Sequence, residues 1–420
     1  MPAGVAPVGR PATEQRSQNT TDSSTSQLGI GQVGYAFMGA AHSQAWQTAP
    51  RFFDLPMHPE LRVLCGRDPA ALAEAARRFG WQSTETDWTR LVARDDVDLI
   101  DICTPGDTHA DIAIAALDAG KHVLCEKPLA NTVAEAQAMT AAADRAAGRG
   151  VLAMVGFTYR RVPAVALARR LVEQGRIGEI RHVRAQYLQD WIVDPQFPLV
   201  WRLQKDKAGS GALGDIGAHI VDAAQFVAGD VLTGVSALTE TFVKERPLAE
   251  ATSGLSATGG AGGDVELGPV TVDDAALFVA RFSGGALGSF EATRFATGRK
   301  NTIRLEVNGS LGSIAFDFER MNELLVHDAS GAWGQAALAG FARVDVTEPS
   351  HPYMSAWWPP GHPIGYEHTF THEVADLLDA IGAGTDPAPG FDDGLRVQRV
   401  LAAVEKSAGA EAHWTPVEEK

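Results

Sequence analysis

Asp215 and His219 are four positions apart and could act together on one small molecule. On a helix, residues four apart lie on the same face, so both side chains would reach one ligand. A histidine with a pKa of about 6.5 can accept a proton at neutral pH, and a carboxylate can orient a neighbouring hydroxyl group. The same pair is compatible with half of a metal site or with an ordinary pair on a helix surface, and the spacing alone leaves all three open.

A lysine that follows a predicted strand is the next candidate for chemistry. Lys127 stands in Glu126-Lys127-Pro128, directly after an apolar run at residues 122–125. Residues at the carboxyl end of a parallel strand face the ligand in open α/β sheets. An ammonium group there could hydrogen-bond a reacting oxygen and stabilise developing negative charge, or relay its proton where neighbours lower its pKa.

A glycine-rich segment near residue 34 predicts a dinucleotide site. The pattern G-x-G-x-x-G occurs literally from Gly29, but a polar run precedes it, whereas the fingerprint must follow a buried strand and open a helix. A frame shifted by five residues meets both conditions and carries alanine in place of the middle glycine. We expect a pyrophosphate at the helix N-terminus rather than a turn that binds nothing. The expected contacts are Gly34, Ala36, Phe37, Met38 and Gly39.

Two further segments bear on the cofactor. The strand predicted at residues 61–65 is followed by Arg67, which would face a 2′-phosphate or stack on the adenine, and by Asp68, which is either a helix N-cap or a ribose ligand. The residues therefore leave NAD and NADP open. The loop after the fourth predicted strand also lies where ligands bind in parallel sheets, so we expect cofactor contacts there and after the fifth strand, with an ordinary turn as the alternative. These contacts are Thr104, Pro105, His109, Glu126 and Lys127.

The elements that must position these residues follow two patterns. From residue 28 to about 148, short apolar runs alternate with helical ones, which is typical of a doubly wound parallel sheet, a Rossmann-type α/β domain. After residue 150, strand-like runs follow one another without helical crossovers, which predicts an α+β domain with an open, mostly antiparallel sheet. We expect a disordered tail at 1–27, a dinucleotide-binding domain at 28–149, and a substrate-binding and oligomerisation domain at 150–420.

The open sheet and the long connections have consequences of their own. A broad half-apolar face is unfavourable in water, so we expect a homodimer or homotetramer through the C-terminal sheet. The irregular segments at residues 254–268 and 348–365 are long enough to be functional loops.

Composition excludes several classes of protein. The chain is 45% hydrophobic and 21% charged, which is ordinary for a soluble globular protein, and its net charge of −16 disfavours binding to nucleic acid or anionic membranes. It shows neither a long apolar span nor a signal peptide, and its three cysteines suit buried thiols, so we expect a cytoplasmic protein. His368 and His372 lack the H-E-x-x-H arrangement, so no metal is expected.

The shifted glycine loop, the Glu126-Lys127-Pro128 tripeptide and the Asp215-x-x-x-His219 spacing together resemble the glucose–fructose oxidoreductase/inositol dehydrogenase/rhizopine-catabolism (Gfo/Idh/MocA) family. The resemblance runs from about residue 28 to the C-terminus. It implies that Lys127, Asp215 and His219 act on a substrate hydroxyl group. Members differ in whether the lysine or the histidine is the base, and we predict His219. Residues 187–191, 201–205 and 208–215 further resemble the levoglucosan-oxidising branch, which favours NAD slightly.

Besides Asp215 and His219, further residues are candidates for contact with a carbohydrate substrate. Flat aromatic faces suit the apolar faces of sugar rings, with core packing as the alternative for each tryptophan. The arginine after the sixth strand could reach the substrate or be solvated at the surface. The expected contacts are Tyr159, Arg160, Gln189, Asp190 and Trp191, and Trp201, Trp357 and Trp358 lie in or beside predicted loops.

The resemblance implies an NAD(P)-dependent dehydrogenase that oxidises a ring hydroxyl of a pyranose, anhydrosugar, inositol or glycoside to a ketone. An alternative is a hydrolase or lyase in which transient oxidation acidifies a neighbouring C–H bond, a glycosidic bond is eliminated, and the retained cofactor re-reduces the product. A remote alternative is a non-catalytic cofactor-binding sensor. A sensor would not need the lysine, aspartate and histidine together.

Overall fold

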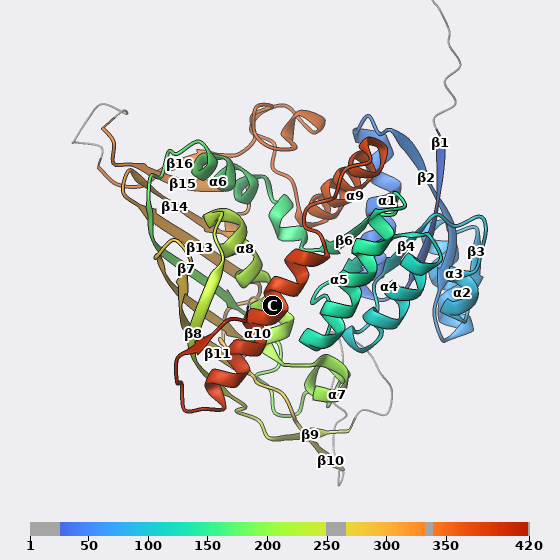
Figure 1. Ribbon diagram of the computed structural model, residues 1–420, viewed down its shortest axis with the longest axis horizontal. Helices are drawn as coiled ribbons and strands as arrows, with labels where there is room; N and C mark the ends of the chain where they lie inside the picture. The colour runs from blue at the N-terminus through green and yellow to red at the C-terminus, as the bar shows by residue number, and fades with distance from the viewer. Residues whose placement is uncertain (1–25, 249–265, 332–338, 419–420) are drawn as a thin grey trace, which may run out of the picture.

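The computed structural model describes residues 26–248, 266–331 and 339–418, which form two large sheets and a two-stranded one, with helices between and around the large sheets (Figure 1). Residues 1–25 of the predicted tail and most of the loop predicted at 254–268 lie outside these ranges. Ser26 and Gln27 were assigned to the tail, but they are the first residues of β1.

Within the described ranges, six strands form the parallel sheet in the order β3-β2-β1-β4-β5-β6, and every neighbouring pair runs parallel. This order confirms the predicted Rossmann-type domain. Its last strand lies beyond residue 149, so the sheet extends past the boundary drawn from the sequence. The strands are β1 (Ser26–Val33), β2 (Met57–Cys65), β3 (Ser83–Glu85), β4 (Leu99–Ile102), β5 (His122–Glu126) and β6 (Ala153–Gly156).

Helices connect the strands of the parallel sheet, and side chains cap the starts of some of them. Asp68 caps one helix, and Thr132 with Glu135 forms a capping box on another. The short strand β3 and the single-turn helix after it were not predicted, because three to five residues carry little periodicity. The helices are α1 (Phe37–Phe52), α2 (Pro69–Phe79), α3 (Trp88–Val92), α4 (His109–Asp118) and α5 (Val133–Ala147).

The second sheet, called here the open sheet, has nine strands among the described residues, in the order β16-β15-β14-β13-β7-β12-β11-β8-β17. Its pairs are antiparallel except β7 with β12, which confirms the predicted mostly antiparallel sheet. The strands are β7 (Ile180–Leu188), β8 (Leu232–Glu240), β11 (Ala275–Phe282), β12 (Leu287–Thr293), β13 (Thr302–Gly309), β14 (Gly312–Asp317), β15 (Glu323–Asp328), β16 (Ala342–Asp345) and β17 (Thr415–Pro416).

Helices cover one face of the open sheet and join it to the parallel sheet. The helices α6 (Pro163–Glu173) and α8 (Ala218–Ala228) pack on its strands, while α10 (Phe391–Ala408) lies between the two sheets and contacts both β8 and α5 (Figure 1). The helix α9 (Tyr366–Ala383) returns to the first domain and packs against α1. The second domain also contains a short helix, α7 (Lys205–Ala208). It further contains a small antiparallel pair of strands, β9 (Glu245–Pro247) and β10 (Leu267–Pro269).

Two other features bear on the sequence-based expectations. None of the helices in the described ranges combines the length and apolar character that a membrane crossing needs. Cys65, Cys103 and Cys125 are unpaired thiols, and the first and last of them are buried.

Candidate active site

The glycine loop has the geometry of the shifted frame. β1 ends at Val33 and α1 begins at Phe37, whereas Gly29 lies inside the strand. Gly34 has a φ of 101°, and a Cβ there would lie 2.7 Å from the carbonyl oxygen of Cys103. A Cβ on Gly39 would lie 2.2 Å from the carbonyl oxygen of Gly34. Both positions therefore require glycine.

The loop presents a cradle of backbone N–H groups. Ala36 has a φ of −72°, which any residue adopts, and it precedes α1 without any side-chain cap. The first N–H groups of an uncapped helix bind anions, so the loop fits a dinucleotide pyrophosphate. Gln32, which the sequence analysis missed, holds the loop, because its buried amide donates to the carbonyl oxygens of Gly34 and Gly39, both at 2.9 Å.

The end of β2 carries no ribose-binding carboxylate of the usual kind. Asp68 is the N-cap of α2, and its Oδ1 accepts hydrogen bonds from the N–H groups of Ala70 and Ala71 at 2.9 and 3.2 Å. Of the two roles considered, the structure shows the capping one. Arg67 is exposed just beyond the strand.

The loop after β4 lies beside the glycine loop. His109 was predicted to contact the cofactor, but its ring nitrogens face backbone carbonyl oxygens. The imidazole is buried, with Nε2 2.8 Å from the carbonyl oxygen of Thr104 and Nδ1 3.0 Å from that of Pro128. Both ring nitrogens are therefore used to tie the loops after β4 and β5 together, and none is left for a cofactor. Thr104 and Pro105 remain partly exposed and stay candidate contacts.

Lys127 meets Asp215 across the junction of the two domains. Asp215 lies in a π-helical turn (Leu213–Gly217) that runs directly into α8, which carries His219. The ammonium group of Lys127 donates to the carbonyl oxygen of Asp215 at 2.6 Å and lies 3.6 Å from its Oδ1. The two side chains keep 12% and 25% of their surface exposed, so a ligand can reach both.

Cations surround the Asp215 carboxyl group. Arg294 is fully buried and places a guanidinium nitrogen 3.6 Å from Oδ2. Burial opposes ionisation of Asp215, but the charges of Lys127, Arg202 and Arg294 outweigh it and lower the pKa of the carboxyl group. Asp215 is therefore an ionised hydrogen-bond acceptor at neutral pH.

Asp273 holds the segment that carries Asp215. Its two carboxylate oxygens accept hydrogen bonds from the N–H groups of Gly211 at 2.7 Å and Leu213 at 2.8 Å, and Arg294 donates to its carbonyl oxygen at 3.1 Å. The sequence analysis missed Asp273 and Arg294. Neither residue belongs to a local motif, because each contacts the site only through the pairing of distant strands.

His219 lies in an aromatic environment. Its ring centroid is 4.6 Å from that of Tyr159 and 5.8 Å from that of Tyr187, whose hydroxyl groups are 2.9 Å apart. Burial and the charge of Lys127 lower the pKa of His219 well below its usual value, so the imidazole is neutral at pH 7. Its Nδ1 is buried and has no hydrogen-bond partner among the described residues.

Two further predicted contacts lie around this cluster. Gln189 donates to Asn301 at 2.8 Å, and Asn301 also accepts from the hydroxyl of Tyr187 at 2.7 Å. Trp191 donates to Gln189 at 3.0 Å and has its ring beneath the guanidinium group of Arg294. These residues support the walls of the site.

Arg160 and Asp190 are not part of the cluster, contrary to prediction. The Arg160 guanidinium group is held by Asp222 at 2.5 Å and by Asp393 at 3.3 Å. The Asp190 carboxylate binds Lys300 at 2.8 Å and an N–H group of a neighbouring turn. Each charge is neutralised by a partner from a distant segment, so neither side chain is directed to Asp215 or His219.

The tryptophans of the 348–365 segment are packing residues. Trp357 contacts Phe52 and Phe53, and its indole donates to His372 at 2.7 Å. The other imidazole nitrogen of His372 lies 2.9 Å from the carbonyl oxygen of Arg161, and burial lowers its pKa to about 3. This segment joins the end of α1 to α9 instead of reaching the site.

Comparisons with known proteins agree with this geometry. Residues 28–157 match a family model described as "Oxidoreductase family, NAD-binding Rossmann fold". Residues 165–315 match a second family model, described as "GFO/IDH/MocA C-terminal domain". A levoglucosan dehydrogenase of Pseudarthrobacter phenanthrenivorans is 45% identical over 93% of this chain and 98% of its own.

Two solved structures are similar over their whole length. An oxidoreductase domain protein from Kribbella flavida has 65% identity and a TM-score of 0.88, and it covers 94% of this chain and 100% of its own. A levoglucosan dehydrogenase in complex with NADH and levoglucosan has 44% identity and a TM-score of 0.86 over the same shares. The chain therefore belongs to the GFO/IDH/MocA oxidoreductase family and carries that family's NAD-binding Rossmann domain.

Proposed function

We propose that this protein is an NAD-dependent sugar dehydrogenase that oxidises a ring hydroxyl group to a ketone, with an anhydrosugar of the levoglucosan type as its first candidate substrate. The observation that carries this proposal is the convergence of Lys127, Asp215 and His219 at the junction of the cofactor-binding domain and α8. The name of the 45% identical relative supports the choice of substrate class.

Each of the three residues has a different role, which follows from its charge state. His219 is neutral and accepts the proton of the reacting hydroxyl group at an imidazole nitrogen. Lys127 donates a hydrogen bond to the same oxygen and stabilises the negative charge that develops on it. Asp215 is ionised and accepts a hydrogen bond from the adjacent hydroxyl group, which orients the ring. Bound NAD supplies the acceptor for the hydride that leaves the carbon.

We propose NAD rather than NADP as the working cofactor. The solved relatives described with NADH support NAD, whereas the exposed Arg67 would suit a 2′-phosphate. Dissociation constants for NADH and NADPH, measured by fluorescence titration of the purified protein, decide the point. We expect NADH to bind at least about tenfold more tightly, and tighter binding of NADPH would refute the assignment.

The substrate is tested by a screen with two readouts. Anhydrosugars, inositols and aryl glycosides are incubated with the enzyme and excess NAD, and both reduced cofactor and released aglycone are measured. Stoichiometric NADH with an anhydrosugar supports the dehydrogenase. Release of aglycone without net change in the cofactor would instead establish the oxidoreductive glycosidase. The proposal would be refuted if no carbohydrate gave either reduced cofactor or released aglycone.

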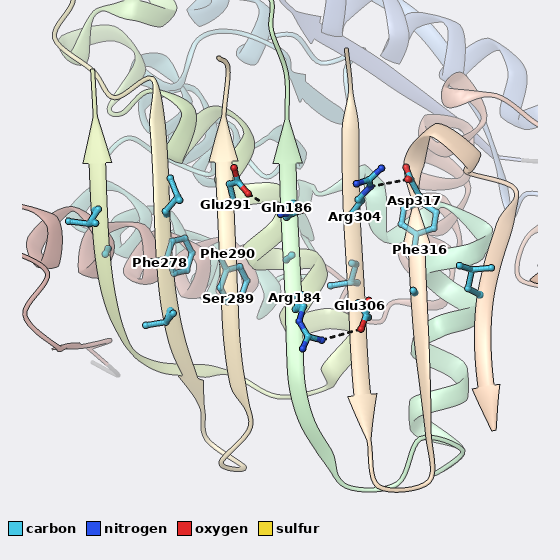
Figure 2. Close-up of a pocket in the computed structure, with 18 of the residues that line it drawn as sticks. Arg184, Gln186, Phe278, Ser289, Phe290, Glu291, Arg304, Glu306, Phe316 and Asp317 are labelled. Atoms are coloured by element: carbon cyan, nitrogen blue, oxygen red, sulfur yellow. Dashed lines mark hydrogen bonds and ion pairs between the residues drawn. The ribbon is translucent and has the colours of Figure 1, made fainter. Parts of the chain in front are cut away.

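We also propose that the uncovered face of the open sheet binds a second copy of this chain. This face has a depression of about 690 Å³ across strands β8, β11, β12, β7, β13, β14 and β15 (Figure 2). Charged pairs cross its centre, including Arg184 with Glu306 and Arg304 with Asp317. Five large apolar side chains are 37–64% exposed on its strands, which is unfavourable in water. They are Leu238, Leu277, Val279, Leu287 and Leu325.

The oligomer is tested by light scattering after size-exclusion chromatography. Leu277→Arg places a charge on the face, and we expect it to reduce the native particle to a monomer. Leu311→Arg is the matched control, because Leu311 is 44% exposed but lies in the turn between β13 and β14. A monomeric native protein, or an oligomer unaffected by Leu277→Arg, would refute the proposed interface.

A further inference from the structure

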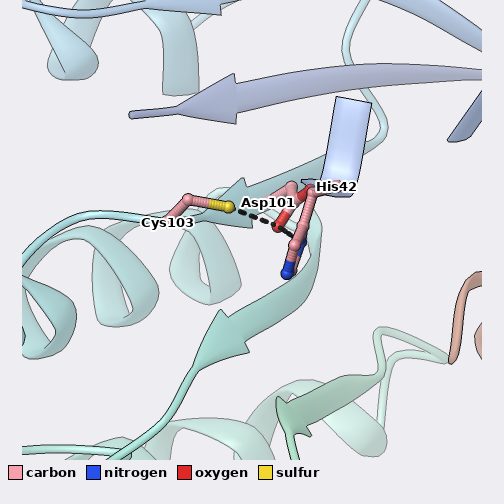
Figure 3. Close-up of side chains that lie close together, drawn as sticks. All are labelled: His42, Asp101 and Cys103. Atoms are coloured by element: carbon pink, nitrogen blue, oxygen red, sulfur yellow. Dashed lines mark hydrogen bonds and ion pairs between the residues drawn. The ribbon is translucent and has the colours of Figure 1, made fainter. Parts of the chain in front are cut away.

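A cluster of buried polar side chains lies beneath the cofactor loop and has no role in the proposed chemistry. His42 projects from α1 toward Asp101 of β4, with Cys103 just beyond that strand (Figure 3). His42, Asp101 and Glu126 are each no more than 4% exposed. Burying charged groups is costly unless they are hydrogen-bonded to one another, so the contacts within the cluster explain how it is tolerated.

The hydrogen bonds form a continuous chain from α1 to Lys127. His42 Nδ1 lies 2.9 Å from Asp101 Oδ1, and His42 Nε2 lies 3.1 Å from Glu126 Oε1. The other oxygen of Glu126 accepts the backbone N–H of Lys127 at 2.9 Å. Trp46, one turn along α1, donates to Asp101 at 2.7 Å and fixes the far end of the chain.

The imidazole has the geometry of a cation between two carboxyl groups. Each ring nitrogen faces a carboxyl oxygen, so each carries a proton to donate. Burial opposes a charged His42, but Asp101 and Cys103 outweigh it and raise its pKa well above the usual value. The titratable groups that face His42 are Asp101 and Cys103 from β4 and its end, Glu126 from β5, and Glu373 and Tyr366 from α9.

We propose that His42 is a positioning residue that couples the cofactor-binding helix α1 to Lys127. By bridging Asp101 and Glu126, it fixes the Glu126 carboxyl group, which in turn fixes the backbone of the lysine. The Lys127 ammonium group is held at its other end by the carbonyl oxygen of Asp215. The proposal rests on the proposed function, because it concerns the lysine assigned there to stabilise the reacting oxygen.

A metal ion is the other occupant that this cluster could suggest, because His42, Asp101 and Cys103 offer ligand atoms within 4.8 Å of one another. The hydrogen bonds favour the positioning role instead. Both imidazole nitrogens are directed at carboxyl oxygens, and burial together with Asp101 raises the pKa of the Cys103 thiol, which keeps it protonated.

The test compares His42→Gln with Phe370→Leu in the full-length enzyme. The glutamine removes the bridge and its charge, whereas Phe370 only packs against the imidazole at 5.5 Å. We expect His42→Gln to lower kcat at least tenfold, with the sugar KM and the affinity for NADH within about threefold of the native values, because Lys127 acts on charge that develops in the transition state. The pH profile of kcat should also move upward by about half a unit or more, because uncompensated carboxylates raise the pKa of His219.

Phe370→Leu should lower the melting temperature without moving the pH profile. A kcat of His42→Gln within twofold of native, or a fall in kcat with an unchanged pH profile, would overturn the proposal. If His42→Gln does not fold, Asp101→Asn is measured in its place. The same result is expected, a lower kcat with a sugar KM close to the native value. A stoichiometric metal in the native protein that Asp101→Asn loses would also overturn it.

Lys127→Ala is measured in parallel. Full activity there would refute the proposed function itself, whereas an inactive Lys127→Ala beside an active His42→Gln refutes only the coupling.

Discussion

Replacing His219 by glutamine tests the proposed base directly. Glutamine is similar in length but cannot take up a proton at neutral pH, so it removes the base while filling much of the same space. The imidazole packs at 4.6 Å from Tyr159 and 5.8 Å from Tyr187, and alanine there would open a gap between the rings. Glutamine therefore separates the loss of proton transfer from the loss of packing.

The expected loss follows from the role of the group. General base catalysis contributes about 10²–10⁴-fold to a rate, and each factor of ten corresponds to about 1.4 kcal/mol of transition-state stabilisation. We therefore expect kcat to fall at least about 100-fold, or roughly 2.7 kcal/mol. The affinity for NADH should stay within about twofold, because the imidazole is carried by α8 and not by the glycine loop.

The assay is the initial rate of NADH formation with the best sugar of the screen, alongside fluorescence titration of NADH and thermal unfolding. His58→Gln is the matched control, because His58 is an exposed histidine on β2 and should keep native turnover. Near-native kcat in His219→Gln would show that His219 is not the base. A similar fall in the control would show that the loss does not come from this site.

The pH dependence of the native enzyme gives an independent check. A base is active when unprotonated, so kcat/KM falls as the pH drops through the pKa of His219. Burial and the Lys127 charge lower that pKa well below 6.5, so the acid limb should lie below about pH 6.5. An acid limb above pH 7 in the rate profile would contradict this charge state.

Three other substitutions test the remaining parts of the site. Lys127→Ala should lower kcat at least about 100-fold with native NADH affinity, measured by initial rates and titration. Arg294→Met removes one cation beside Asp215, so the pKa of the carboxyl group rises, and we expect the sugar KM to increase more at pH 5 than at pH 8, read from KM against pH. Gly39→Ala brings a Cβ within 2.2 Å of a loop carbonyl oxygen and should weaken NADH binding at least about tenfold, whereas Gly409→Ala, with a nearest atom at 3.4 Å, should not.

Local patterns predicted those parts of the structure that depend on neighbouring residues. Alternating apolar runs gave the parallel sheet, and the position of the first strand placed the glycine loop in the correct frame. The cap formed by Asp68 followed from the proline after it. Each of these features is decided within about ten residues of chain, so the sequence carries the information directly.

Ion pairs between distant segments could not be predicted in this way. Arg160 and Asp190 were expected at the substrate, but Asp222 and Lys300, 62 and 110 residues further along, hold them elsewhere. Arg294 reaches Asp215 only because the strands of the open sheet bring residues of β12 and its end next to the turn before α8. Such partners depend on strand order, which no local pattern reveals.

Lys127 sets different charge states at two groups that lie one helical turn apart. Burial by itself raises the pKa of Asp215 and lowers that of His219, which would leave both groups nearer to neutrality. The charges of Lys127, Arg202 and Arg294 together reverse the first effect, and the lysine charge also strengthens the second, so the aspartate is ionised while the histidine is neutral. The π-helical turn and α8 together supply the spacing of the pair, but Lys127, which follows β5 of the other domain, supplies part of the charge. The proposed division of labour between an orienting carboxylate and a neutral base therefore depends on contact between the two domains, and any change that moved Lys127 away from Asp215 would alter both roles together.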